Sequence, residues 1–322
     1  MKKLIRRHST PPVLSEGNAS HESPRTRKAQ RLLRQVHADL LNRDPEKYGD
    51  WLSKLKAGRA FVRHNPFVWN NPYFERALER LALIDVIYGF GRKADDISDK
   101  DAPLPAGWAS PADCIEHLVT FVRDRNATND DLEFLLDYAL DMGDALGMDI
   151  REGISHILRS LLFDARRGAN PSPVILTRAE LEENYFLLDE EGTIGLCLMI
   201  LGESRASFAD ISLLGMATRI QYTLRDLRED MCKGLCNVPS EDFKALGMYV
   251  PDVASKTEIQ HWFDSTPTRA WRSKEAARGL SLYAQYEARR EQLQVHHLTQ
   301  AILEFLYERS TKRGLQEALR VA

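Results

Sequence analysis

The sequence predicts an all-α protein, and three observations support this prediction. Apolar residues recur at three- and four-residue spacings along nearly the whole chain beyond residue 28, which is the period of an amphipathic helix. The alternating pattern typical of β-strands is missing. Breaks between the helical stretches fall at residues 103–105, 170–173 and 266–267, where proline and its neighbours favour turns. We therefore expect one all-α domain over residues 29–322.

Each helix is predicted from the spacing of its apolar residues, because side chains three and four positions apart share one helix face. No repeat at a solenoid period is present, so the helices are expected to form a single array rather than a stack of units. In chain order, the predicted helices cover residues 31–41, 73–93, 111–123, 130–145, 151–166, 178–186, 193–200, 207–232, 241–246, 274–294 and 296–309.

The first 28 residues are rich in Ser, Pro, Arg and Lys and carry few bulky apolar side chains. Such a segment buries too little apolar surface to order itself, so we expect residues 1–28 to form a flexible N-terminal tail. Its Arg-Ser character is compatible with a transit peptide, but Glu16 and Glu22 favour a plain tail.

The composition is that of an ordinary globular protein, with 322 residues, 43% of them hydrophobic and 28% charged. A formal net charge of −3 gives no basic footprint for nucleic acid. The four scattered cysteines fit a reducing compartment better than a disulfide framework. Because no apolar run approaches a membrane span and the N-terminus lacks the apolar core of a secretory signal, we expect a cytoplasmic protein.

Two pairs of aspartates have the helical i, i+4 spacing, far apart in the chain: Asp95 with Asp99, and Asp226 with Asp230. Each pair points to one side of its helix, so its two negative charges repel unless a cation lies between them. Carboxylate oxygens are ligands that Mg²⁺ prefers, and the ion completes its shell with water and substrate phosphate oxygens. Two such helices facing each other would hold magnesium ions around a diphosphate.

Spacing alone is not specific, because Asp137 and Asp141 have it as well. We interpret that third pair as a solvated helix face, the usual position of acidic residues. The other two pairs differ in their flanks, since Arg92 stands three residues before the first pair and Arg225 directly before the second. A guanidinium group binds phosphate oxygens in a bidentate manner, which a purely solvated face would not need.

Residues 88–99, Tyr-Gly-Phe-Gly-Arg-Lys-Ala-Asp-Asp-Ile-Ser-Asp, resemble the first aspartate-rich motif of the squalene/phytoene synthase family at every fixed position. Residues 224–230 and their continuation to Gly247 resemble the second motif. Between them, residues 192–196 resemble the family's Ala-Gly-Thr-Val-Gly-Leu segment. The resemblance is good from Gly58 to Gly247 and loose beyond, and it implies an isoprenoid synthase-type bundle of helices around a central cavity.

The resemblance implies a Mg²⁺-dependent prenyltransferase that condenses two prenyl diphosphates, farnesyl or geranylgeranyl, head to head (1′–1). The product would be a squalene- or phytoene-type hydrocarbon of the carotenoid or hopanoid pathways, or its cyclopropyl diphosphate intermediate. NADPH would be needed only for reduction to squalene. A hydrocarbon product is compatible with peripheral membrane association, and the enzyme would be a monomer or a homodimer. The implied metal ligands are Asp95, Asp96, Asp99, Asp226 and Asp230.

The resemblance also implies contacts with the substrate. The family has a tyrosine near the reacting carbons, and here Tyr185 has the hydroxyl whereas the family's spacing selects Phe186. The apolar segment after Gly192 is, on its sequence alone, best explained as a buried core helix. The resemblance favours a tunnel instead, in which Gly192 and Gly195 would let a prenyl tail approach the backbone. Gly215 stands where the family keeps a small residue. The remaining implied substrate-binding residues are Tyr88, Arg92 and Arg225.

The helix predicted over residues 151–166 is followed at once by Arg167, and its end carries Asp164 and Arg166. Basic residues at a helix C-terminus usually complement the helix dipole, so we do not assign these residues to the site.

Departures from the family pattern affect the predicted site. Arg219 and Tyr222 stand where the family usually has glutamine and asparagine. Arginine cannot ligate a cation and a neutral phenol is a poor ligand, so we expect one metal site to be rebuilt or absent, with Arg219 supplying its charge directly to phosphate. His64 and Asn65 replace the serine and lysine that often hold the second diphosphate. The family's terminal basic helix has no clear copy after Arg313.

Three alternatives remain open. A terpene synthase would use the same fold on a single prenyl diphosphate, without the second-substrate contacts. A non-catalytic relative would have a binding or assembly role, although a scaffold gains nothing from the paired like charges that this chain retains. A generic helical scaffold with solvated aspartates is disfavoured by the ordered flanks of the two motifs.

Overall fold

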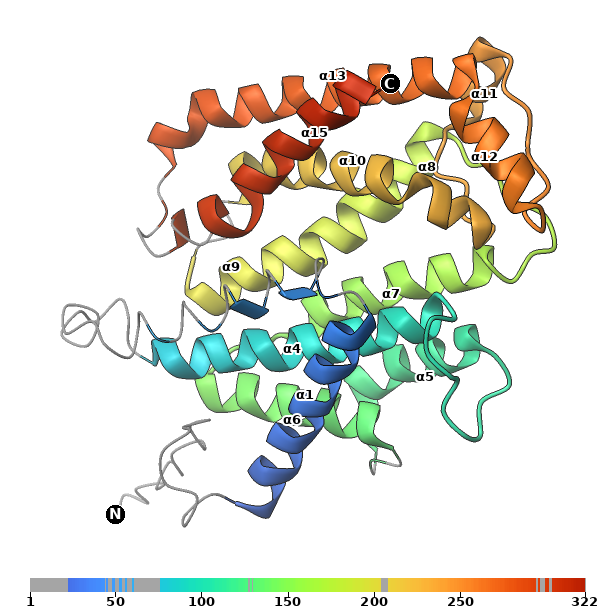
Figure 1. Ribbon diagram of the computed structural model, residues 1–322. Coiled ribbons are helices and arrows are strands. Elements are labelled where there is room, and N and C mark those ends of the chain that lie inside the picture. Colours follow the sequence, from blue (N-terminus) through green and yellow to red (C-terminus); the bar gives the residue numbers. More distant parts are fainter. Residues whose placement is uncertain are drawn as a thin grey trace, which may run out of the picture. The chain divides into compact units, whose positions relative to one another are not determined.

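The computed structural model describes residues 23–43, 76–126, 130–203, 208–293 and 303–321, together with short pieces between them. Every regular element in this described part is a helix, so the all-α prediction is confirmed (Figure 1). None of the described helices is long and apolar enough to cross a membrane.

The helices follow the predicted order, and most of their ends lie close to those expected from the sequence. In chain order they are α1 (Pro24–Arg43), α4 (Ala77–Ser98), α5 (Pro111–Asp124), α6 (Asp131–Leu146), α7 (Arg151–Arg167), α8 (Arg178–Glu182), the π-helix η2 (Glu183–Gly195), α9 (Leu196–Leu201), α10 (Phe208–Cys232), α11 (Ser240–Leu246), α12 (Lys256–Asp264), α13 (Thr266–Arg289), the 3₁₀ turn η4 (Arg290–Gln292), the π-turn η5 (Glu304–Glu308) and α15 (Arg309–Val321).

The chain divides into two compact units. Unit 1 contains the described residues of Met1–Phe90 and Arg125–Arg151, and unit 2 contains those of Gly91–Asp124 and Glu152–Ala322. The single domain expected over residues 29–322 therefore stays a prediction.

In unit 1, α1 packs against α6. Leu33, Val36 and Leu40 are buried on α1 at the three- and four-residue steps of a helix face. The helix already begins at Pro24, so residues 24–28 of the expected tail are helical.

The third aspartate pair lies on α6 and is ion-paired. Arg125 donates to Asp137 Oδ1 at 2.6 Å and also contacts Asp141, and Arg25 of α1 lies 2.7 Å from Asp141 Oδ2. Arg125 has a backbone φ of 45°, an uncommon conformation for a residue with a Cβ. The solvated-face interpretation was therefore wrong in one respect, because arginines rather than water alone neutralise this pair.

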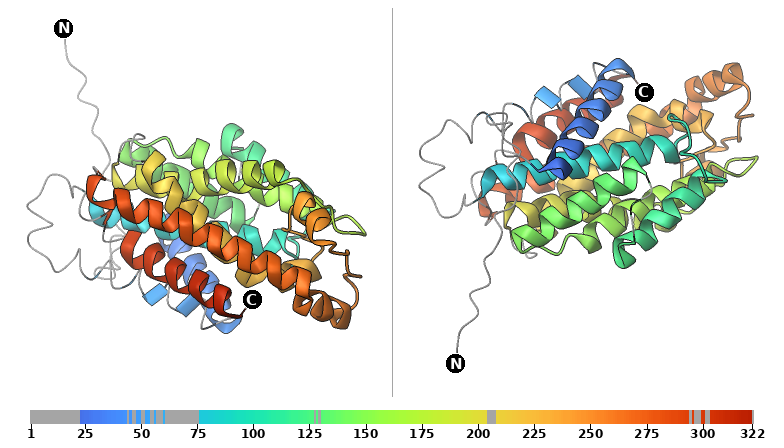
Figure 2. Two further views of the ribbon diagram at one scale, coloured as in Figure 1. Left: turned by 90° about the horizontal axis from the view of Figure 1, so that it is seen from above. Right: turned by 90° about the horizontal axis from the view of Figure 1, so that it is seen from below.

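Unit 2 is built around α10, which packs against η2, α13 and α15. The left view of Figure 2 shows α13 in orange beside α15 in red. The apolar residues of α10 recur every three or four positions, which fixes one face of the helix against its neighbours. Burying such a face stabilises the fold by about 25 cal/mol for each Å² of apolar surface removed from water. The buried apolar residues include Ile211, Leu214, Ala217, Ile220, Leu224, Leu227 and Met231 on α10, and Trp271, Ala276, Tyr283 and Tyr286 on α13.

The two helices predicted over residues 178–186 and 193–200 form one continuous helical run in the structure, through α8, η2 and α9. Gly192 does not interrupt it. A Cβ at this position would lie 2.9 Å from the Ile157 backbone nitrogen of α7, so the glycine lets η2 approach α7 closely. The sequence pattern predicts a gap between two helices here, whereas the chain continues through this segment in the wider turns of a π-helix.

The C-terminal part of the chain contains two helices that the sequence analysis did not predict, α12 and α15. The predicted break at residues 266–267 is a helix start, because the Ser265 hydroxyl caps the Thr268 amide and Pro267 lies in the first turn of α13. Helix α15 packs against α13 and α10 and carries basic residues.

Candidate functional site

The first aspartate pair lies at the C-terminal end of α4, in the part of that helix that belongs to unit 2. Arg92 lies 2.8 Å from Asp95 Oδ2 and 3.6 Å from Asp96 Oδ1. The Asp99 amide donates to the Asp95 carbonyl at 2.8 Å, which continues the helical hydrogen-bond pattern by one residue. Asp95 and Asp99 therefore share a helix face, and Arg92 is ion-paired with the first of them.

The second aspartate pair lies in the last turns of α10. Arg225 forms a bidentate ion pair with Asp226, with distances of 2.7 and 2.6 Å, and its guanidinium group lies 4.6 Å from the centroid of the Tyr222 ring. Asp230 accepts a hydrogen bond from Nδ2 of Asn237 at 2.9 Å. The arginine that the sequence analysis assigned to phosphate is thus bound to its own aspartate here.

Lys233 joins the two motifs. Its ammonium group lies 3.0 Å from Asp99 Oδ2, 3.0 Å from Asp101 Oδ2 and 3.3 Å from Glu229 Oε1. The sequence analysis included Lys233 in the second motif's continuation without giving it a role. Its partner Asp99 lies 134 residues away in the chain, so no local pattern could have indicated the contact.

The carboxylates of the two motifs act on one another. Burial, followed by the charge of Asp95, raises the pKa of Asp99 to about 7. Burial, followed by the charge of Asp226, raises the pKa of Asp230 to about 8, and Asp99 contributes to this shift. Both carboxyls therefore hold their protons more tightly than an exposed aspartate does.

This donor set fits Mg²⁺ in its chemistry, because it offers crowded carboxylate oxygens whose repulsion a divalent cation would relieve. Among the described residues, however, no three acidic, histidine or cysteine side chains lie together as a ready metal site. The motif aspartates are instead held by Arg92, Arg225, Lys233 and Asn237. Binding of a cation would require these carboxylates to exchange their present partners.

Arg167, at the end of α7, is 4% exposed and lies at the centre of a buried polar cluster. It donates to the Tyr185 hydroxyl at 2.9 Å, to Asn237 Oδ1 at 3.2 Å and to the Cys236 carbonyl at 2.7 Å. Asp164 accepts from the same guanidinium at 2.9 Å. The interpretation of Arg167 as a simple dipole complement was wrong, since its side chain turns inward to Tyr185 and Asn237.

Arg219 and Tyr222 both lie against other site residues. The Arg219 guanidinium carbon is 3.8 Å from the centroid of the Tyr185 ring, and its charge lowers the pKa of Asp230 against the stronger effects that raise it. A fixed cation thus stands beside the second aspartate pair, at one of the positions where the sequence departs from the family.

A pocket in unit 2 holds about 550 Å³ of space that no atom occupies, part of it open to solvent. Tyr185, Arg219 and Asn237 line it, and Asn237 connects it to Asp230. The other lining residues include Leu181, Met216, Ile220, Leu224, Pro239 and Trp271, which are apolar, and Arg178, Glu182, Glu190, Glu275 and Arg278, which are charged.

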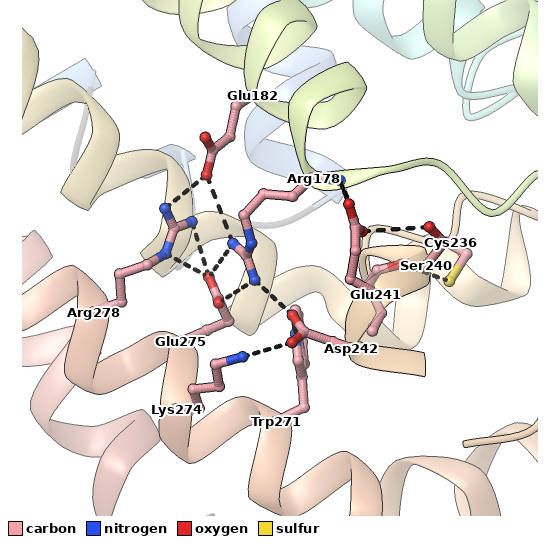
Figure 3. A network of polar contacts seen from close by, with 11 residues as sticks. Arg178, Glu182, Cys236, Ser240, Glu241, Asp242, Trp271, Lys274, Glu275 and Arg278 are labelled. Carbon is pink, nitrogen blue, oxygen red and sulfur yellow. Dashed lines mark hydrogen bonds and ion pairs between the residues drawn. The ribbon is translucent and has the colours of Figure 1, made fainter. Parts of the chain in front are cut away.

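A charged network forms one side of this pocket (Figure 3). Arg178 of α8 lies 2.8 Å from Glu275 of α13 and 2.6 Å from Asp242 of α11. Arg278 lies 2.8 Å from Glu182. The sequence analysis missed this network because its partners lie 64 to 97 residues apart in the chain.

Two of the three glycines of the predicted site are required for close packing. Gly192 allows η2 to approach α7, whereas a Cβ at Gly195 would make only ordinary contact with Phe208 at 3.6 Å. A Cβ at Gly215 would collide with the Glu190 carboxylate, so this glycine leaves room for a buried acid. None of the three is among the pocket-lining residues.

Two further residues of the predicted site have no assigned place beside the aspartates. Tyr88 lies on α4 in the part that belongs to unit 1 and is partly buried. His64 lies outside the described residues, together with Asn65.

No protein-family model matches this chain, and no curated protein matches it. Among solved structures, a dehydrosqualene synthase in complex with a ligand is similar in fold, with 16% sequence identity and a TM-score of 0.48. The alignment covers 85% of this chain and 98% of that one. At this identity the likeness concerns the course of the chain and says nothing about activity.

Proposed function

We propose that this protein is a Mg²⁺-dependent prenyltransferase that condenses two prenyl diphosphates head to head. The observation that carries the proposal is the pairing of two aspartate motifs, each with its own arginine, across Lys233 and beside a partly apolar pocket. The motif sequences agree with it, since they resemble those of the squalene/phytoene synthase family.

The aspartates Asp95, Asp99, Asp226 and Asp230 would hold Mg²⁺, with Asp96 beside them. When bound, the ion would neutralise the diphosphate leaving group, where negative charge develops in the transition state. Arg92 and Arg225 would then turn from their aspartates to phosphate oxygens, for which the guanidinium fork is suited.

The pocket would hold the prenyl tail. Apolar residues of α8, α10 and α13 supply a surface on which a hydrocarbon chain loses its contact with water, which favours binding. Tyr185 stands in the pocket wall, so its hydroxyl and ring would face the reacting carbons. Because the product would be a hydrocarbon, we also propose peripheral contact of the protein with membranes.

A second candidate is a terpene synthase acting on one prenyl diphosphate, and the lining of the pocket favours it. Charged residues interrupt the apolar lining of the pocket, which leaves less apolar wall for a second prenyl tail. Head-to-head condensation requires room for two tails.

Product analysis decides between these candidates. Purified protein is incubated with Mg²⁺ and farnesyl or geranylgeranyl diphosphate, with and without NADPH, and the organic extract is examined by mass spectrometry. We expect a hydrocarbon with the carbon count of two substrates, or its cyclopropyl diphosphate precursor, and dependence on NADPH would identify a reductive step. A cyclised or hydroxylated product from one substrate would establish the terpene synthase instead. Absence of any product would overturn both and leave a binding or assembly role.

A further inference from the structure

Tyr185 and Asn237 line the pocket, and Arg167 lies behind them. Arg167 is 4% exposed, Asn237 is 4% exposed and Tyr185 is 6% exposed. A buried guanidinium group is costly unless its donors are satisfied. The role of the charged Arg167 side chain behind the pocket wall is therefore to be found in the groups that it contacts.

The donor and the acceptor of each hydrogen bond in this cluster can be assigned, starting from Arg167. Arg167 has only donors, so the Tyr185 oxygen must accept from it at 2.9 Å. The Tyr185 hydroxyl then donates its own proton to Asn237 Oδ1. The same oxygen accepts twice from Arg167, at 3.2 Å each. Because Oδ1 is fully engaged as an acceptor, the amide nitrogen of Asn237 is left to donate to Asp230 Oδ2 at 2.9 Å.

This order fixes the character of the Tyr185 hydroxyl. Its proton is committed to Asn237, so the oxygen can offer the pocket only a lone pair. The planar fork of Arg167 sets the ring's position at the same time, since it also donates to the Cys236 carbonyl at 2.7 Å. Asn237, through its amide, ties this wall to the second aspartate pair.

We propose that Arg167 and Asn237 are positioning residues, which hold the Tyr185 hydroxyl in the pocket wall as a hydrogen-bond acceptor and link it to Asp230. The expected effect on catalysis rests on the proposed function, because these residues belong to the same site. The geometry of the hydroxyl can be tested independently of that function.

The kinetic test uses Arg167→Lys, which keeps the charge but cannot reach three acceptors in one plane. With the allylic diphosphate as substrate, we expect kcat to fall by roughly tenfold to a hundredfold with KM little changed, as for a small misplacement of a reacting group. Arg166→Lys is the matched control, since Arg166 lies next to it, is 57% exposed and pairs with Glu116. That control should keep the wild-type kcat.

A double-mutant cycle separates positioning from a merely structural role. If Arg167 acts through the hydroxyl, Arg167→Lys should cost almost nothing further in a Tyr185→Phe background. Equal fold-losses in both backgrounds, or an unchanged kcat for Arg167→Lys alone, would overturn the proposal. Asn237→Asp keeps the acceptor oxygen but removes the donor to Asp230, so it should lower kcat as well, whereas a wild-type kcat would contradict the assigned link.

A spectroscopic experiment tests the position of the Tyr185 hydroxyl without requiring enzymatic turnover. The protein is labelled with ¹³C at tyrosine Cζ, and Tyr185→Phe identifies the Tyr185 resonance. Arg167→Lys should shift that resonance, because it changes the donor to the phenolic oxygen, and Arg166→Lys should not. A wild-type protein without turnover would refute only the proposed function, whereas an unmoved resonance would refute the positioning role.

Discussion

Asp99 and Asp230 are alike in their surroundings, since each is a half-buried carboxyl whose pKa is raised by burial and by a neighbouring aspartate. Their pKa values of about 7 and about 8 lie above the ordinary value of 3.8. In the folded, metal-free protein these two carboxyls therefore bind more protons than in the unfolded chain from about pH 4 to about pH 8, so their contribution to stability falls as the pH rises through that window.

The first prediction concerns Asp230→Asn, which keeps the shape and the acceptor for Asn237 but removes the buried charge. We expect this variant to melt at a higher temperature than the wild type at pH 8, with a smaller difference at pH 5, because the difference between the two proteins grows as the pH rises from about 4 to about 8. Thermal unfolding of the metal-free proteins at the two pH values measures this difference.

Asp137→Asn is the control with the opposite sign. Burial alone would raise the pKa of Asp137, but hydrogen bonds from Arg125 and Arg25 hold it below the ordinary value. Removing this stabilised charge should lower the melting temperature at pH 8. Destabilisation of the protein by both substitutions would contradict the account of Asp230.

A second prediction concerns Mg²⁺. Protons and the cation compete for the same carboxylates, so Mg²⁺ with inorganic pyrophosphate should raise the melting temperature more at pH 8 than at pH 5. The double variant Asp95→Asn, Asp226→Asn should lose most of this increase. An increase of equal size at both pH values, or one that survives in the double variant, would mean that the cation binds elsewhere.

At the scale of the elements, amphipathic helices were predictable from the period of their apolar residues, as α5, α6 and α7 illustrate. The π-helix η2 was not, because its wider turns change the residue period over Glu183–Gly195 and remove the signal. Helix α15 was missed because few apolar residues mark it, with Leu315 as its fully buried one.

A pair of glycine substitutions tests the packing of η2. A Cβ at Gly192 would lie 2.9 Å from a backbone atom of α7, which cannot give way easily, so Gly192→Ala should destabilise the protein by about 1–3 kcal/mol. Gly195→Ala meets only Phe208 at 3.6 Å and gains helix propensity of up to about 1 kcal/mol. Denaturant unfolding of both variants should therefore give free energies of unfolding that differ in opposite directions from the wild type. A neutral Gly192→Ala would refute the close approach.

At the scale of the whole molecule, the aspartate pairs could be found from the sequence because their signal lies within a few residues. The residues that contact and position these aspartates could not be found in the same way. Lys233 and Asp99 are 134 residues apart, and Arg167 and Asn237 are 70 apart, so only the folded chain brings them together. The position of the charged network around Arg178, beside a partly apolar pocket, could not be predicted from the sequence either.

The central claim is that the two aspartate motifs act together with Mg²⁺ on an allylic diphosphate. The most direct measurement is the release of pyrophosphate from farnesyl or geranylgeranyl diphosphate. Three proteins are compared: the wild type, the motif double variant Asp95→Asn, Asp226→Asn, and the control double variant Asp137→Asn, Asp141→Asn. We predict Mg²⁺-dependent release by the wild type and the control, and none by a motif variant that still unfolds cooperatively. Release that persists in the motif variant, or that needs no Mg²⁺, would contradict the account.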